Sequence, residues 1–230
     1  LRVYESESDL AEARWIVDEV QSLSREGMRY QDIAILYRSN AQSRVIEHAL
    51  FSAGIAYRVY GGLRFFERAE VKHALAYLRL VASPEDDNAF LRVCNFPPRG
   101  IGARSVETLI DAARAANSPL YAAITSLSGK SGTALTAFRV LIEGLREETR
   151  GLPLPEMAGH VIARSGLVEH YRTEREGADR IDNLNELVNA AAAFDPEEAV
   201  IDMATGETTD PTLMDPLAAF LTHAALEAGE

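Results

Sequence analysis

The sequence predicts a chain of two parts, an α/β segment over residues 1–62 and a larger all-helical region over residues 63–230. In the first part, short apolar runs alternate with stretches of helical periodicity, a pattern typical of α/β folds with a parallel sheet. After residue 62, apolar residues recur at helical spacing and no convincing strand follows. The predicted fold class is therefore α/β followed by all-α.

The first part is expected to contain strands separated by helices. The predicted strands are 1–5, 33–37 and 57–60, and the predicted helices are 8–27 and 41–53. The run Ile33–Tyr37 is continuously apolar, which is typical of a strand buried on both faces of a parallel sheet. About three strands make a thin sheet with open edges, so we interpret this part as an incomplete piece of a larger nucleotide-binding-type domain.

The second part is expected to be a series of helices joined by short turns. The predicted helices are 67–81, 88–95, 105–116, 119–127, 134–150, 156–165, 178–193 and 216–228, with a turn at 128–133 and a loop at 205–216. Within that turn, Gly129–Ser131 copies the end of a phosphate-binding P-loop. The loop needs a glycine five positions earlier, where Ile124 stands, so we reject a nucleotide site there.

The stretch Pro98–Arg104, called the hairpin below, has the most informative sequence in the chain. A Pro-Pro pair ends the preceding helix, a Gly-Ile-Gly turn follows, and a new helix begins near Ser105. Free backbone N–H groups at a helix N-terminus favour an anion, and Arg99 and Arg104 flank the turn. Two interpretations stay open: a clamp for one DNA phosphate, or a helix–helix turn whose Ile101 fills the core.

Charge is unevenly distributed along the chain. The net charge is −12, which argues against nucleic-acid binding by the overall field. Residues 33–104, however, carry ten Lys/Arg against six Asp/Glu, whereas the remainder carries thirteen against twenty-nine. This asymmetry permits a local phosphate site on an otherwise repelling surface.

Composition points to a cytoplasmic protein without disulfides or a metal. No apolar run is long enough to span a membrane, and no signal peptide opens the chain. The single cysteine, Cys94, is expected to be a small core residue. The five histidines share no ligand spacing, so no metal site is expected.

Four segments resemble signature segments of superfamily 1 DNA helicases of the UvrD/Rep/PcrA type, most closely the UvrD branch: Ile33–Arg44, Gly61–Lys72, Pro98–Gly102 and Ala218–Leu226. The resemblance implies that residues 1–62 are part of the RecA-like motor domain 2A. It implies that residues 63–230 are its helical insertion, 2B, with a helix-hairpin-helix-like turn. Gly61–Gly62 would then be a hinge between them.

The resemblance implies an ATP-dependent 3′-to-5′ DNA helicase of DNA repair as the parent protein, with ATP and Mg²⁺ as its cofactors. This chain lacks the P-loop and the acidic motor motif, so we expect no catalytic residue, no cofactor and no ATPase activity in it alone. Expected partners are a single-strand/duplex DNA junction read without sequence preference, the remaining motor domains, and repair proteins; no membrane is expected. The alternative is a regulatory or protein-interaction module of a helicase or helicase–nuclease, with incidental DNA contact.

The resemblance also implies two sets of DNA-binding residues. In the first part, single-stranded DNA would meet Arg38, Ser39 and Asn40. In the second, duplex DNA would meet Arg99, Gly100, Ile101, Gly102, Arg104 and Ser105, with backbone amides holding a phosphate. The competing interpretation of the first set is that Asn40 caps the next helix and Arg38 forms a local salt bridge.

Three further basic residues, Arg64, Arg68 and Lys72, are spaced by four along one predicted helix face. They would either extend the basic track or pair with Glu67 and Glu70.

Overall fold

The computed structural model describes residues 3–38, 40–59, 63–195 and 215–228. The chain divides into two compact units. The first unit comprises Leu1–Arg68 together with Ala225–Glu230, and the second unit comprises Ala69–Ala224. The sequence places the division at residue 62, whereas the first unit continues to Arg68.

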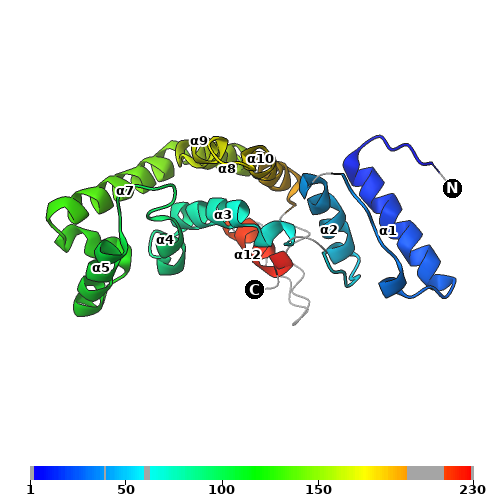
Figure 1. Ribbon diagram of the computed structural model, residues 1–230, viewed down its shortest axis with the longest axis horizontal. Coiled ribbons are helices and arrows are strands. Elements are labelled where there is room, and N and C mark those ends of the chain that lie inside the picture. Colours follow the sequence, from blue (N-terminus) through cyan, green and yellow to red (C-terminus); the bar gives the residue numbers. More distant parts are fainter. Residues whose placement is uncertain (1–2, 39, 60–62, 196–214, 229–230) are drawn as a thin grey trace. The chain divides into compact units, whose positions relative to one another are not determined.

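The first unit is built on two helices that pack side by side, α1 (Asp9–Arg25) and α2 (Ser43–Ser52) (Figure 1). Ser8 caps α1, since its Oγ accepts a hydrogen bond from the Ala11 amide at 3.2 Å. The buried core between these helices consists of Val17, Val20, Leu50 and Ile55. Single 3-10 turns lie at Tyr30–Asp32, Asn40–Gln42 and Phe65–Glu67.

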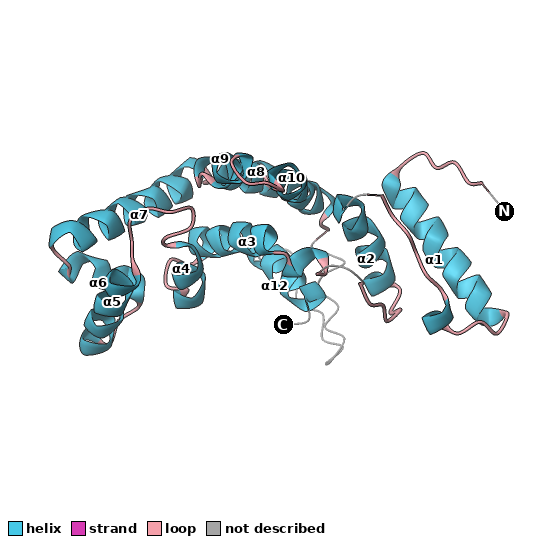
Figure 2. Cartoon of the chain, in the orientation of Figure 1, coloured by secondary structure: helices cyan, strands magenta, loops and turns pink. Residues whose placement is uncertain are grey.

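The predicted parallel sheet is wrong: none of the described residues forms a strand (Figure 2). Ile33–Tyr37 is extended but pairs with no neighbouring segment among the described residues. Ile33 and Ile35 pack against the α1–α2 core, while Leu36 is 94% exposed. Because a strand exists only when a second segment pairs with its backbone groups, an apolar run alone does not make a sheet.

The other two predicted strands fail for the same reason. Residues 3–5 and 55–59 are irregular and unpaired, and the remaining residues of those predictions lie outside the described part of the chain. No RecA-like sheet is therefore present in the residues that the structure describes. The Gly61–Gly62 pair, predicted as a hinge, also lies outside them.

Residues after the glycine pair are bound to α2 within the first unit. The Glu47 carboxylate is buried and accepts hydrogen bonds from the Phe65 amide at 3.1 Å and the Tyr57 hydroxyl at 3.3 Å. Burial raises the pKa of Glu47. The Arg68 guanidinium donates to Ser43 Oγ at 2.7 Å. The turn Phe65–Glu67 is thereby attached to the first unit.

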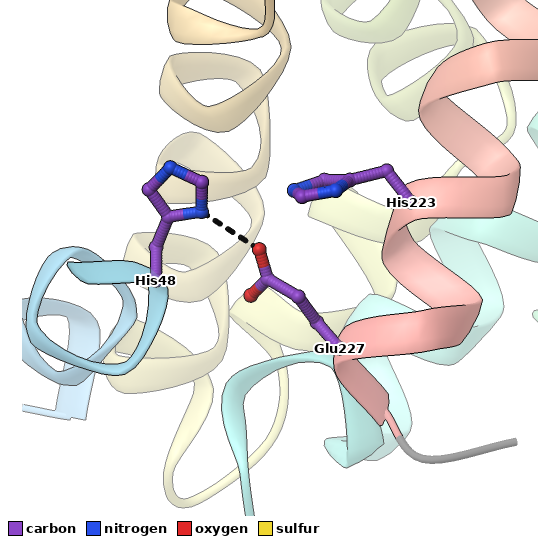
Figure 3. Close-up of side chains that lie close together, drawn as sticks. All are labelled: His48, His223 and Glu227. Carbon is purple, nitrogen blue, oxygen red and sulfur yellow. Dashed lines mark hydrogen bonds and ion pairs between the residues drawn. The ribbon is translucent and has the colours of Figure 1, made fainter. Parts of the chain in front are cut away.

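The end of the chain also contributes to the first unit. Helix α12 (Pro216–Ala228) carries Glu227 near its C-terminus, and Glu227 Oε1 lies 2.8 Å from His48 Nδ1 on α2 (Figure 3). The Glu227 side chain is only 3% exposed, so this contact satisfies a buried carboxylate. His223 precedes it by one turn on the same helix.

The second unit is all-helical, as predicted. In addition to most of α12, its helices are α3 (Ala69–Ala82), α4 (Asp87–Val93), α5 (Ala103–Ala116), α6 (Leu120–Ala123), α7 (Gly129–Glu148), α8 (Leu154–Arg164), α9 (Leu167–Arg172) and α10 (Gly177–Ala193). Helix α3 is central and packs against α4, α7, α8 and α10. Its Tyr77 and Leu78 are fully buried, as are Phe90 of α4 and Phe138 of α7.

Two details of the helical prediction differ from the structure. The residues predicted as a turn at 128–133 form the start of α7, whose first residue, Gly129, has a φ of 72° that glycine accommodates. Helix α9 was hidden from the periodicity analysis because it has only six residues. Most of the predicted loop at 205–216 lies outside the described residues. Among the described helices, none is both long and apolar enough to cross a bilayer.

Candidate nucleic-acid interface

The hairpin Pro98–Arg104 lies in the connection between α4 and α5, and both of its glycines face open space. Gly100 has a φ of 76°, a left-handed conformation that strongly favours glycine. Gly102 has a φ of −80° and precedes the first residue of α5. A side chain at either position would meet no heavy atom within 4 Å. The backbone of the bend is therefore accessible from outside.

The amides of the hairpin fall into two groups. Those of Arg99 and Ile101 donate to the side-chain carbonyl of Asn95, at 2.8 and 3.0 Å. In the described part of the chain, no hydrogen bond engages the amides at positions 100, 102, 103 and 104. These four belong to exposed residues at the bend and the start of α5, where the helix dipole favours an anion.

Two of the predicted site residues point into the protein. Ile101 is 2% exposed, so the side chain fills the core as the second interpretation of the hairpin requires. Ser105 is 9% exposed, and its hydroxyl lies 2.8 Å from Ser131 Oγ. Ser131 belongs to the first turn of α7, so this contact brings the N-terminal ends of α5 and α7 together. The core-filling side chain and the open backbone coexist in one turn.

Arg99 and Arg104 have different surroundings although both flank the bend. The Arg99 guanidinium donates to the carbonyls of Pro97 at 2.8 Å and Ser165 at 2.7 Å. Arg104 is exposed, and no ion pair with its side chain occurs among the described residues. Arg104 is therefore the basic side chain of the pair that is available to a ligand.

The base of the hairpin is an aromatic cluster. The Phe96 ring stacks on His73 with 3.9 Å between centroids and meets the His170 ring edge-on. The Phe96 carbonyl accepts from the Tyr77 hydroxyl at 2.6 Å. Burial, reinforced by nearby cationic groups, lowers the pKa of His73 to about 4, so this ring is neutral at pH 7. His73 Nδ1 lies 2.9 Å from the Tyr171 hydroxyl.

The first predicted set of DNA-binding residues lies in the other unit and is only partly described. Arg38 is exposed, and its amide donates to Gln42 Oε1 at 3.0 Å. Ser39 and the side chain of Asn40 lie outside the described residues. The residue that immediately precedes α2 is Gln42, and a 3-10 turn begins at Asn40.

Two of the basic residues spaced by four, Arg64 and Arg68, are held by contacts within the first unit. Arg68 is buried against Ser43, and Arg64 lies over the Tyr57 ring, 5.5 Å from its centroid. Glu70 pairs instead with Arg180, at 3.3 Å. Arg68 therefore neither lines an exposed track nor pairs with Glu70.

Comparison with known proteins decides the family. The whole chain, residues 1–230, matches the UvrD-like helicase C-terminal domain. The chain belongs to the UvrD-like helicase C-terminal domain family. It is 44% identical to DNA helicase II of Escherichia coli over 238 residues, which cover 100% of this chain and 32% of the relative.

Two further relatives of this UvrD-like chain are similar in extent. DNA helicase II of Haemophilus influenzae is 44% identical, with 99% of the chain and 31% of the relative covered. The ATP-dependent DNA helicase PcrA of Bacillus subtilis is 35% identical, with 98% of the chain and 30% of the relative covered. The chain thus spans about a third of the length of the curated relatives that it matches.

Sequence reasoning missed the residues that hold the hairpin of this UvrD-like domain. Asn95 offered a signal, because the short side chain of an asparagine near a turn commonly bonds to the backbone of that turn, and Asn95 stands two residues before the Pro-Pro pair. Tyr77 and Ser165 offered none, since they meet the hairpin only through the tertiary fold.

Proposed function

We propose that this chain is the part of an ATP-dependent DNA helicase that grips duplex DNA near a single-strand junction. The observation that carries the proposal is the set of exposed backbone amides at the start of α5 that have no hydrogen-bond acceptor among the described residues, next to the exposed Arg104. Amides at a helix N-terminus and an arginine together form a site for one phosphate, which holds the backbone without reading bases. Relatives named DNA helicase support the substrate class.

The proposal extends to the parent protein. ATP and Mg²⁺ would bind to motor segments that this chain does not carry, since its sequence has no P-loop motif. The chain alone would bind DNA and would not hydrolyse ATP. Translocation from 3′ to 5′, a role in DNA repair and a single-strand contact through Arg38 belong to the same proposal.

The test is binding of a forked DNA in a titration over a range of salt concentrations. We expect weak binding that falls steeply with salt and depends little on sequence. Arg104→Glu removes one phosphate contact and adds a repelling charge, so binding at low salt should weaken by roughly tenfold or more.

Arg114→Glu is the matched control. Arg114 lies on the same helix at the opposite end, its side chain is 79% exposed, and its charge change is identical. We expect this variant to bind DNA like the wild type. Equal loss in both variants would mean that only overall charge matters, and no loss in either would remove the hairpin from the interface. The same pair should be compared in the full-length helicase by its unwinding rate.

A further inference from the structure

We infer that Arg99 is a positioning residue of the hairpin, one that holds the open amides in place without touching DNA itself. This inference rests on the proposed function, because it assigns to Arg99 a different task from that of Arg104 in the same site. Sequence alone makes the two arginines equivalent, since both flank the Gly-Ile-Gly turn.

Both terminal nitrogens of the Arg99 guanidinium donate within the protein. Nη1 donates to the carbonyl of Pro97 at 2.8 Å and approaches that of Val93 at 3.5 Å, and Nη2 donates to the carbonyl of Ser165 at 2.7 Å. The guanidinium also lies over the rings of Tyr77 and Phe138, 5.7 and 5.6 Å from their centroids. A phosphate would have to compete with all of these contacts.

Two of the carbonyls that Arg99 contacts lie at helix ends. Val93 is the last residue of α4, and Ser165 is the residue that follows α8. Carbonyls at a helix C-terminus lack a partner within the helix and carry partial negative charge, so a cation there is favourable. Arg99 thus connects the hairpin to the ends of two helices that are distant in sequence.

Asn95 secures the same turn from within. Its side-chain carbonyl accepts from the amides on either side of Gly100, those of Arg99 and Ile101. The side chain of Asn95 thus holds the backbone of the bend, and the side chain of Arg99 ties the bend to the surrounding helices. Fixing a binding loop in advance lowers the entropy lost when a ligand binds.

A lysine cannot replace this arrangement. An ammonium is a compact charge on a flexible stem, whereas the guanidinium is a planar fork that donates in several directions and stacks on rings. A conservative exchange at position 99 therefore separates charge from geometry. At an ordinary phosphate contact, lysine keeps most of the attraction.

The experiment compares Arg99→Lys and Arg99→Met with Arg104→Lys and Arg104→Met for binding to forked DNA over a range of salt concentrations. We expect both Arg99 variants to bind roughly tenfold more weakly while keeping the wild-type salt slope, because no phosphate contact is lost. Arg104→Lys should retain most of the binding, and Arg104→Met should reduce the slope by about one. If Arg99→Lys binds like the wild type and Arg99→Met reduces the slope, Arg99 is itself a phosphate contact and the inference is wrong.

A second measurement needs no DNA. Amide hydrogen exchange at Ile101, the one amide among positions 100–104 that is hydrogen-bonded within the described residues, should be faster by about tenfold in Arg99→Lys than in the wild type, since local opening governs exchange of a bonded amide. Asn95→Ala, which changes no charge, should have the same effect. Unchanged exchange in both variants would overturn the inference. Failure of the wild type to bind DNA would instead remove the proposed function and leave the exchange result standing.

Discussion

The hairpin of the second unit and the extended segment Ile33–Tyr37 of the first unit are held in opposite ways. In the hairpin, polar groups are paired locally, with Asn95 accepting two amides and Arg99 donating to carbonyls on both sides. The extended segment is held by Ile33 and Ile35 against the helical core, and its backbone has no ladder partner among the described residues. The hairpin contains residues that the sequence predicts to contact DNA, and the extended segment is followed directly by another such residue, Arg38.

The difference shows which parts of the chain determine a hairpin and which determine a β-strand. The hairpin is specified by side chains within a few residues of it, together with the tertiary contacts of Arg99 and Phe96. A β-ladder is specified by a second segment, which must be supplied from elsewhere. We therefore expect substitutions in the hairpin to be costly and substitutions on the open side of the extended segment to be nearly silent.

The largest effect is expected for Ile101→Ala. Ile101 is 2% exposed, and truncation of a buried isoleucine costs about 2–4 kcal/mol through lost burial and the cavity left behind. Urea unfolding followed by far-UV circular dichroism should show a lower midpoint. DNA binding should weaken as well, because the buried Ile101 side chain fixes the bend of the hairpin. A midpoint within error of the wild type would mean that the hairpin is not anchored by its apolar residue.

An intermediate effect is expected from pH at the base of the hairpin. The pKa of His73 is about 4 in the fold and near 6.5 when the chain is unfolded. The unfolded chain therefore takes up the proton first as the pH falls, and stability is lost between about pH 6.5 and 4. From pH 7 to pH 5, allowing for partial exposure of the ring, we expect a loss of about 1–2 kcal/mol.

The measurement is urea unfolding at both pH values. His73→Phe keeps an aromatic ring on Phe96 and removes the titrating group, so the difference between the two pH values should shrink. An equal pH dependence in His73→Phe and the wild type would assign the effect to other groups.

The smallest effect is expected on the open face of the extended segment. Leu36→Ser changes a residue that is 94% exposed, so stability should shift by less than about 0.5 kcal/mol. Ile35→Ala, on the packed face, should cost about 1–2 kcal/mol because this residue is only partly buried. The only tryptophan, Trp15, stacks on Tyr4 in the first unit, so its fluorescence reports this unit selectively. Equal costs for both variants would contradict the one-sided packing.

These contrasts also explain what the sequence could predict. Helix positions in the second unit followed from apolar spacing, and the structure adds caps such as Asp86, whose side chain accepts from the Ala89 amide. The strand at Ile33–Tyr37 failed because local pattern carries no information about a pairing partner. In the hairpin, residue types predicted an open turn, yet nothing near Arg99 in the sequence indicated that its partner is the Ser165 carbonyl.

The attachment of Phe65–Glu67 to α2 matters for anyone who wishes to dissect the chain by truncation. Cutting at the paired glycines would discard the Phe65 amide and the Arg68 guanidinium, leaving the buried Glu47 carboxylate with hydroxyl partners alone. A buried carboxylate that loses hydrogen-bond donors destabilises the folded unit. A shortened first unit therefore has to continue to Arg68, six residues beyond the position that composition alone suggests, and it would still lack the Glu227 partner of His48.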